Sequence, residues 1–218
     1  MKFDLYPELT ELANDDLLLI WDFSNEALNS VKLSTLKTFF GVVAEEPTGT
    51  PLNYISDGDA NGTFYFLGTN LGTTQWSNPA GSNLAIAASS TEYGSANLLT
   101  DRQNSEFWTN PIANSWVSFH ILTGKLNCNY YSLRTRGTNP NYYPRNWILQ
   151  GSDDGVTWID LDVQVNNTTL SSPAQWLSLP VTTNDSYSYF RILQNGLDSS
   201  NSHYFCLGEI ELYGLYEA

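Results

Sequence analysis

The stretch NWILQGSDDGVTW, residues 146–158, decides the predicted fold. It joins a short apolar run to a turn at Asp154-Gly155 and ends on Trp158. Along the chain, short apolar runs alternate with turn pairs of the same kind, which are Asp57-Gly58, Asn61-Gly62 and Asn195-Gly196. Short strands between closely spaced turns are typical of an all-β sandwich and not of helices that alternate with strands.

Predicted strands fill the main part of the chain, over residues 63–67, 84–88, 115–121, 130–134, 147–152, 189–193 and 205–213. In the last of these, Ile210 and Leu212 alternate with Glu209, Glu211 and Tyr213. Because successive side chains of a strand point to opposite faces, we expect one face of this strand to be exposed to water.

The first 44 residues differ in pattern from the rest. Residues 17–21 and 31–33 are predicted strands, and residues 35–40 form a predicted short helix. Pro47, Gly49 and Pro51 indicate a linker over residues 45–53. A unit this small is not stable alone, so it packs either on the main domain or on copies of itself. The linker favours copies of itself, and therefore an oligomer.

Charge limits the possible partners. The chain of 218 residues has 23 Asp and Glu against 9 Lys and Arg, a net charge of −14. This balance excludes direct binding to nucleic acid and disfavours an anionic membrane surface. The longest apolar run, residues 17–21, is far below the ~20 residues of a membrane-spanning helix, and we expect neither membrane insertion nor a secretory signal.

Cys128 and Cys206 are either two buried thiols or a single bridge.

Several segments resemble discoidin-like domains, which are coagulation-factor type C, galactose-binding-like β-sandwiches. They are DGDANGTFYFLGTN (57–70), WSNPAG (76–81), SWVSFHI (115–121), NYYSLRTRG (129–137), NWILQGSDDGVTW (146–158), YFRILQNG (189–196) and EIELYG (209–214). Among discoidin-like domains, these segments resemble most the variant carried by some HECT-type ubiquitin ligases, although nothing in this sequence resembles a HECT domain. The resemblance implies a mainly β, jelly-roll sandwich over residues 54–218. It does not specify a ligand, because this fold hosts lectins, lipid binders and protein binders.

A second resemblance concerns the N-terminal unit. Residues 7–40, PELTELANDDLLLIWDFSNEALNSVKLSTLKTFF, are similar to the opening segments of phage tail-fibre and other virion-attachment proteins. The resemblance implies that residues 1–44 attach the chain to other virion proteins and form a homotrimer. The protein would then be made in the host cytoplasm and act on the virion, at the tail or the particle surface.

Catalysis has little support in the sequence. Nucleophile-elbow, P-loop and dinucleotide-binding motifs are absent. His120 lies within a predicted strand, which indicates a structural role. The acidic pairs are adjacent residues, which point apart and rarely form an acid–base pair. We therefore predict that the protein is not an enzyme.

Calcium is a possible structural ligand, and no cofactor is required. Asp57, Asp59 and Asn61 have the oxygen spacing of the start of an EF-hand loop, but position twelve is Gly68 and not Glu. The alternative is a turn closed by side-chain hydrogen bonds. The discoidin-like resemblance implies a second site, at Asp101 and Glu211. There Arg102 follows Asp101, where the family usually has glycine.

Ligand binding is the chemistry that the sequence supports best. The resemblance places the binding loops at one end of the sandwich, at residues 91–95, 100–106 and 136–144, bordered by 197–204. Tyrosine faces stack on the C–H faces of sugars, and arginine and asparagine bind hydroxyl groups. The predicted site residues are Tyr93, Arg102, Arg136, Asn139, Asn141, Tyr142, Tyr143 and His203. Alternatively, Tyr142 or Tyr143 packs beneath the sandwich as part of the core.

These observations predict a phage tail-fibre or adsorption protein that binds a host-surface glycan without catalysis. The alternative is a structural virion protein, such as a head decoration, baseplate or adaptor protein, whose sandwich binds other virion proteins.

Overall fold

A computed structural model describes residues 17–22, 27–32, 48–138 and 140–218. The chain divides into two compact units, residues 1–48 and 49–218. In the first unit, β1 (Leu17–Asp22) pairs antiparallel with β2 (Ala27–Lys32). This hairpin confirms the first N-terminal strand, whereas the second lies earlier than predicted. The helix predicted at 35–40 lies outside the described residues.

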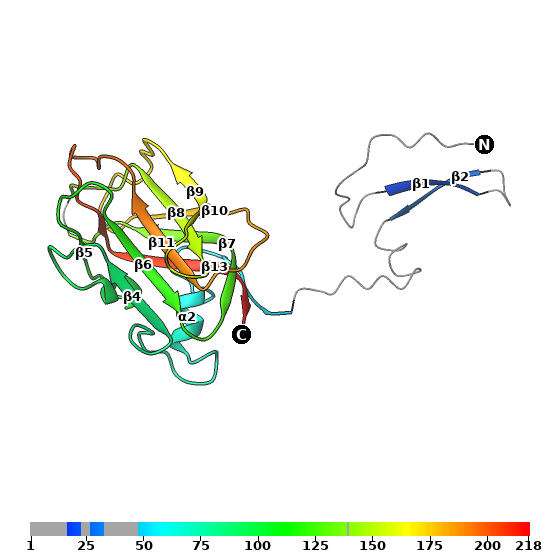
Figure 1. Cartoon of the computed structure of the whole chain (residues 1–218), viewed down its shortest axis with the longest axis horizontal. Helices are drawn as coiled ribbons and strands as arrows, with labels where there is room; N and C mark the ends of the chain where they lie inside the picture. Colours follow the sequence, from blue (N-terminus) through cyan, green and yellow to red (C-terminus); the bar gives the residue numbers. More distant parts are fainter. Residues whose placement is uncertain (1–16, 23–26, 33–47, 139) are drawn as a thin grey trace. The chain divides into compact units, whose positions relative to one another are not determined.

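The second unit is a sandwich of two antiparallel sheets (Figure 1). One sheet has the order β4-β6-β11-β8-β9, formed by Leu84–Ala88, Trp116–Ile121, Tyr189–Gln194, Trp147–Ser152 and Ile159–Gln164. The other has the order β10-β7-β13-β3, formed by Trp176–Pro180, Lys125–Arg134, Glu209–Glu217 and Thr50–Leu52. A short pair, β5 (Phe107–Trp108) with β12 (Cys206–Leu207), lies beside the 3-10 helix η1 (Ala96–Thr100).

The core lies between these two sheets. In β6 and β11 every second residue is buried, and Phe119 on β6 pairs with Phe190 on β11. Trp147 of β8 is fully buried, and its Nε1 donates to the hydroxyl of Tyr131 on the opposite sheet. Burial of each large apolar side chain stabilises the fold by about 1.5–3 kcal/mol, so this alternating pattern accounts for the sandwich.

One predicted strand is wrong. Residues 63–67 belong to a helix, α2 (Thr63–Gly68), which begins after Gly62. The carboxylate of Glu211, on β13, accepts the amides of Phe64 (2.7 Å) and Tyr65 (3.1 Å). A Cβ on residue 62 would lie only 2.1 Å from the Glu211 Cδ, so this approach requires glycine. The helix therefore depends on an acceptor 147 residues away in the sequence.

The water-exposed face predicted for β13 is also wrong. Glu209, Glu211 and Tyr213 are all buried, because other parts of the chain cover this face. Arg134 pairs with Glu209, the first amides of α2 contact Glu211, and the ring of Tyr54 packs edge-on against Tyr213. Residues 50–52, expected in the linker, form β3. Edge strands β9 and β10 were not predicted.

Cys128 and Cys206 are both free and buried, which decides between the two alternatives for the thiols. Among the described residues, no helix has the length and apolar character needed to span a membrane.

Candidate functional site

Four loops meet at one end of the sandwich. The Thr138 amide and hydroxyl both donate to the Glu106 carboxylate, at 2.9 and 2.6 Å, which ties loop 136–144 to loop 100–106. The amide of Tyr142 donates to the Ser200 hydroxyl (3.2 Å), which ties the same loop to residues 197–204. Tyr93 of the fourth loop forms a β-bridge with Trp108. The predicted grouping of these loops is therefore present.

A cavity of about 220 Å³ opens among these loops, lined by Glu92, Trp108, Arg136, Tyr142, Tyr204 and Cys206. Its walls are aromatic. Tyr142 packs edge-on against Tyr204, with ring centroids 4.9 Å apart. Trp108 stacks on Tyr93, with centroids 4.5 Å apart and planes at 18°. Tyr93 is 55% exposed, so it extends the aromatic surface outward from the cavity.

Arg136 is the central cation of the cavity. Its side chain is only 2% exposed. The guanidinium carbon lies 4.8 Å from the ring centroid of Trp108 and 5.1 Å from that of Tyr142. Nη2 donates to the carbonyl of Asn141 at 3.1 Å. Because a guanidinium is planar and permanently charged, these contacts hold it in one orientation before any ligand arrives.

Several buried polar side-chain atoms of loops 136–144 and 197–204 and of β11 have no partner among the described residues. Within the part of the chain that the structure describes, these buried atoms lack a hydrogen-bond partner: Arg136 Nε, Asp198 Oδ2, His203 Nδ1, Tyr143 Oη and Gln194 Oε1. Asp198 Oδ1 is satisfied by the amides of Ser200 (2.7 Å) and Ser202 (3.1 Å). Burial raises the pKa of Asp198, and those amides and the charges of His203 and Arg136 oppose the rise. Buried groups of this kind are normally satisfied by ordered water or a ligand.

The structure separates the predicted site residues into two groups. Arg136 and Tyr142 line the cavity, and Tyr93 stacks on its wall. His203 does not line it, although its charge and that of Arg136 both lower the pKa of Asp198. Tyr143 is 5% exposed and belongs to the buried residues, so the core alternative holds for this tyrosine.

The other predicted residues do not line the cavity with their side chains. Asn141 contributes its backbone carbonyl, and Asn139 lies outside the described residues. Arg102 Nη2 donates instead to the carbonyl of Gly58, with its guanidinium over the ring of Tyr65. Four further residues line the cavity that were not among the predicted site residues, Glu92, Trp108, Tyr204 and Cys206. Glu92 lies in the predicted loop 91–95 and Tyr204 in loop 197–204, which was predicted to border the site.

The residues considered for calcium make other contacts. Asp59 accepts the amides of Ile55, Ser56 and Asn61, as in the alternative of a hydrogen-bonded turn. Burial would raise the pKa of Asp59, but these amides outweigh it and lower the pKa below its usual value. No cluster of three or more His, Cys, Asp or Glu side chains placed to hold a metal occurs among the residues described.

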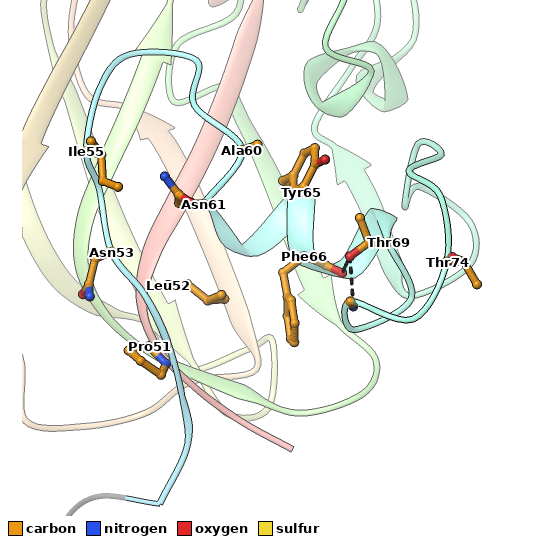
Figure 2. Close-up of a pocket in the computed structure, with 11 residues that line it drawn as sticks. Pro51, Leu52, Asn53, Ile55, Ala60, Asn61, Tyr65, Phe66, Thr69 and Thr74 are labelled. Atoms are coloured by element: carbon orange, nitrogen blue, oxygen red, sulfur yellow. Dashed lines mark hydrogen bonds between the residues drawn. The ribbon is translucent and has the colours of Figure 1, made fainter.

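A wider groove of about 390 Å³ lies on another part of the sandwich, between β3, the loop that follows it and α2 (Figure 2). Leu52, Tyr65 and Phe66 line it, together with Pro51, Asn53 and Thr69. The hydroxyl of Thr69 is occupied, since it donates to the Phe66 carbonyl at 2.8 Å and accepts the Gly72 amide at 2.9 Å. None of the residues that line this groove carries a buried side-chain atom without a hydrogen-bond partner, whereas Arg136 does so in the smaller cavity.

Comparison with solved structures identifies the fold. A CBM32 carbohydrate-binding module from a family 31 glycoside hydrolase of Clostridium perfringens matches at TM-score 0.52 and 16% identity, over 61% of this chain and 92% of the other. Another CBM32 module of this bacterium, in complex with GalNAc-β-1,3-galactose, matches at TM-score 0.51 and 15% identity, over 61% and 96%. The chain has the discoidin-like fold. No family model matches it.

Sequence comparison finds this discoidin-like chain similar to parts of longer proteins. A BTB/POZ domain-containing protein of Arabidopsis thaliana is 32% identical over 180 residues, which is 76% of this chain and 22% of that protein. The E3 ubiquitin-protein ligase Ufd4 of Drosophila melanogaster is 31% identical over 183 residues, which is 79% of this chain and 7% of the ligase. The chain thus spans less than a quarter of the length of these relatives.

Proposed function

We propose that the sandwich is a non-catalytic carbohydrate-binding module and that a cell-surface glycan occupies the cavity around Arg136. The observation that carries the proposal is the arrangement of Arg136 itself. Its guanidinium is buried between Trp108 and Tyr142, and its Nε has no partner among the described residues. The CBM32 modules of the same fold support the proposal, since one of them is in complex with a disaccharide.

The cavity suits a sugar ring. Aromatic faces at Tyr142 and Tyr204 pack against C–H groups, while the charged groups of Arg136 and Glu92, which also line the cavity, form hydrogen bonds with hydroxyl groups. Sites for drug-sized ligands usually enclose roughly 300–1,000 Å³. A cavity of about 220 Å³ is smaller. We therefore assign it a single sugar residue, with the rest of the glycan in solvent.

The N-terminal unit would supply attachment and avidity. On the resemblance of residues 7–40 to tail-fibre segments, we propose that this unit attaches the chain to a virion as a homotrimer. Three weak sites on one trimer gain ~10²–10⁴ in avidity without any new contact. This arrangement would allow adsorption to a host surface despite a net charge of −14, which opposes nonspecific attachment to anionic envelopes.

A second candidate function is binding to another protein, as in a structural virion protein. The curated relatives favour it, because a BTB/POZ protein and an E3 ligase match at 31–32% identity, above the 15–16% of the glycan-binding modules. Their names mention no carbohydrate. In this case the same loops would contact protein side chains.

The test is binding of the full chain to a panel of glycans and lipopolysaccharides, with two matched variants. Tyr142→Ala removes a half-buried ring from the cavity wall and should weaken binding at least about tenfold. Tyr189→Ala is the control, because Tyr189 is also half-buried and stacked on one ring, that of His120, but does not line the cavity. Binding unaffected by Tyr142→Ala would refute the site. Absence of binding across the panel would favour the protein-binding alternative.

A further inference from the structure

Arg102 has a backbone conformation that residues other than glycine rarely adopt. Its φ is +56°, in the left-handed region. Residues held there are strained unless the surroundings compensate. Glycine would adopt the same conformation without strain, so a contribution of the Arg102 side chain to stability must exceed this strain for arginine to be the more stable residue here.

The side chain of Arg102 ends among buried acids. Its Nη2 donates to the Gly58 carbonyl at 2.8 Å, and its guanidinium carbon lies 4.8 Å from the ring centroid of Tyr65. The space that it shares with Glu209 and Glu211 retains only about 10 Å³. Both carboxyls are almost completely buried, at 6% and 5% exposure. Buried carboxylates require positive charge or hydrogen-bond donors nearby. Burial raises the pKa of both carboxyls, and the positive charge of the Arg102 side chain opposes this rise.

The acids here do not fit a calcium ion. Calcium takes 6–8 oxygen ligands at 2.3–2.6 Å. The Glu211 carboxylate already accepts the amides of Phe64, Tyr65 and Leu212, at 2.7, 3.1 and 3.0 Å. The Asp101 carboxylate accepts the Gln103 amide and the Ser105 hydroxyl. The Gly58 carbonyl, an oxygen of the kind that calcium binds, accepts from Arg102 instead.

Arg134 Nη1 already lies 3.3 Å from the Glu209 carboxylate. We propose that Arg102 supplies the further positive charge that this buried acidic site needs, in place of a divalent cation, so that the sandwich folds without metal. An arginine suits this role because it stays protonated when buried and its planar fork reaches several acceptors at once. Arg102 follows Asp101 at the end of η1, and its side chain connects this point to the loop before α2 through Gly58 and to α2 through Tyr65. The proposal is independent of the proposed glycan site.

The test is thermal unfolding of the full chain in EDTA and in CaCl₂. We expect the wild-type Tm to be the same in both. Arg102→Gly should lower the Tm by about 4–10 °C in EDTA, although glycine relieves the positive φ. Arg102→Lys keeps the charge but loses the planar guanidinium, so its Tm should lie between those of the wild type and of Arg102→Gly. Ala174→Gly is the control, because Ala174 is exposed and has a φ of +54°. It should leave the Tm unchanged or raise it.

Two results would overturn the proposal. One is a wild-type Tm that falls by several degrees in EDTA and recovers in CaCl₂. The other is an Arg102→Gly protein with the Tm of the wild type. The variant would then behave as the control Ala174→Gly does, and the Arg102 side chain would add no stability. If Arg102→Gly does not fold, the Tm of Arg102→Lys and calorimetric titration of the wild type with CaCl₂ decide the question: a wild-type Tm for the lysine variant, or heat of binding, would contradict the role of Arg102.

Discussion

Replacing Arg136 by lysine should loosen the candidate site while preserving its charge. Lysine has no planar group that could stack between Trp108 and Tyr142. Its ammonium also binds water more strongly than a guanidinium does, so burying it at a position only 2% exposed costs more free energy. Each cation–π contact contributes about 0.5–2 kcal/mol, and a hydrogen bond from a charged donor such as that to Asn141 about 1.5–3 kcal/mol. Lysine retains part of both, so we expect a net loss of about 2 kcal/mol, or ~4–8 °C in Tm.

The assay is thermal and urea unfolding of the full chain, with Arg145→Lys as the matched control. Arg145 Nη1 donates to the carbonyls of Asn167 (3.1 Å) and Leu170 (2.6 Å), but no ring lies over its guanidinium among the described residues. The control removes an arginine fork without removing aromatic stacking. If Arg136→Lys is no more destabilising than Arg145→Lys, then stacking between the two rings does not hold the site, and the reasoning fails.

Three further predictions concern the interior. Tyr131→Phe should lower the free energy of unfolding by about 1–3 kcal/mol, measured in urea, because Trp147 Nε1 loses its acceptor and Asp162 keeps only the donor of Gln164. A change below ~0.5 kcal/mol would contradict this. Burial raises the pKa of Cys128 and of Cys206 to about 12, so neither thiol should react with a disulfide reagent at pH 8 until denaturant is added, and rapid native labelling would count against it. Burial raises the folded-state pKa of Glu209 to about 7, above its unfolded value near 4.5, so the folded state holds the extra proton between these values. This carboxyl should therefore lower stability as the pH rises from about 4.5 to 7, and Glu209→Gln should remove that part of the slope in urea unfolding; an unchanged slope would exclude it.

Local patterns predicted most of the sandwich. β4 and β8 were predicted with their exact bounds, and β6 and β11 to within one residue, because each is an apolar or alternating run beside a turn signal. The edge strand β4 was thus predicted, whereas the edge strands β9 and β10 were not. β9, with the sequence IDLDVQ, carries Asp160 and Asp162, residues that are depleted in strands. Asp162 is accommodated because it accepts the Tyr131 hydroxyl from the other sheet at 2.6 Å, a contact that no local pattern contains.

The errors at α2 and β13 have one cause. The sequence TFYFLG is rich in aromatic residues and would suit a strand, but its first amides face a carboxylate from β13. Likewise, Glu209 and Glu211 alternate with apolar residues as on a water-exposed strand. They are buried because Arg134, Arg102 and the amides of α2 surround them. Each error concerns one partner of a contact between α2 and β13, which lie far apart in the sequence. The structure of either segment cannot be predicted without knowing that the other contacts it.

The adjacent tyrosines show the same limit at the candidate site. Tyr142 and Tyr143 are the same amino acid at adjacent positions of one loop, so the sequence does not indicate which of them faces a ligand. The backbone of Tyr142 takes a φ of +62°, and Arg136 approaches its ring while holding the carbonyl of Asn141. Tyr143 is then turned inward, where its amide donates to the Ser199 hydroxyl at 2.9 Å. Because the strain at Tyr142 is offset by contacts to Arg136 and to loop 197–204, ligand chemistry at this position depends on both loops and cannot be assigned from the tyrosines alone.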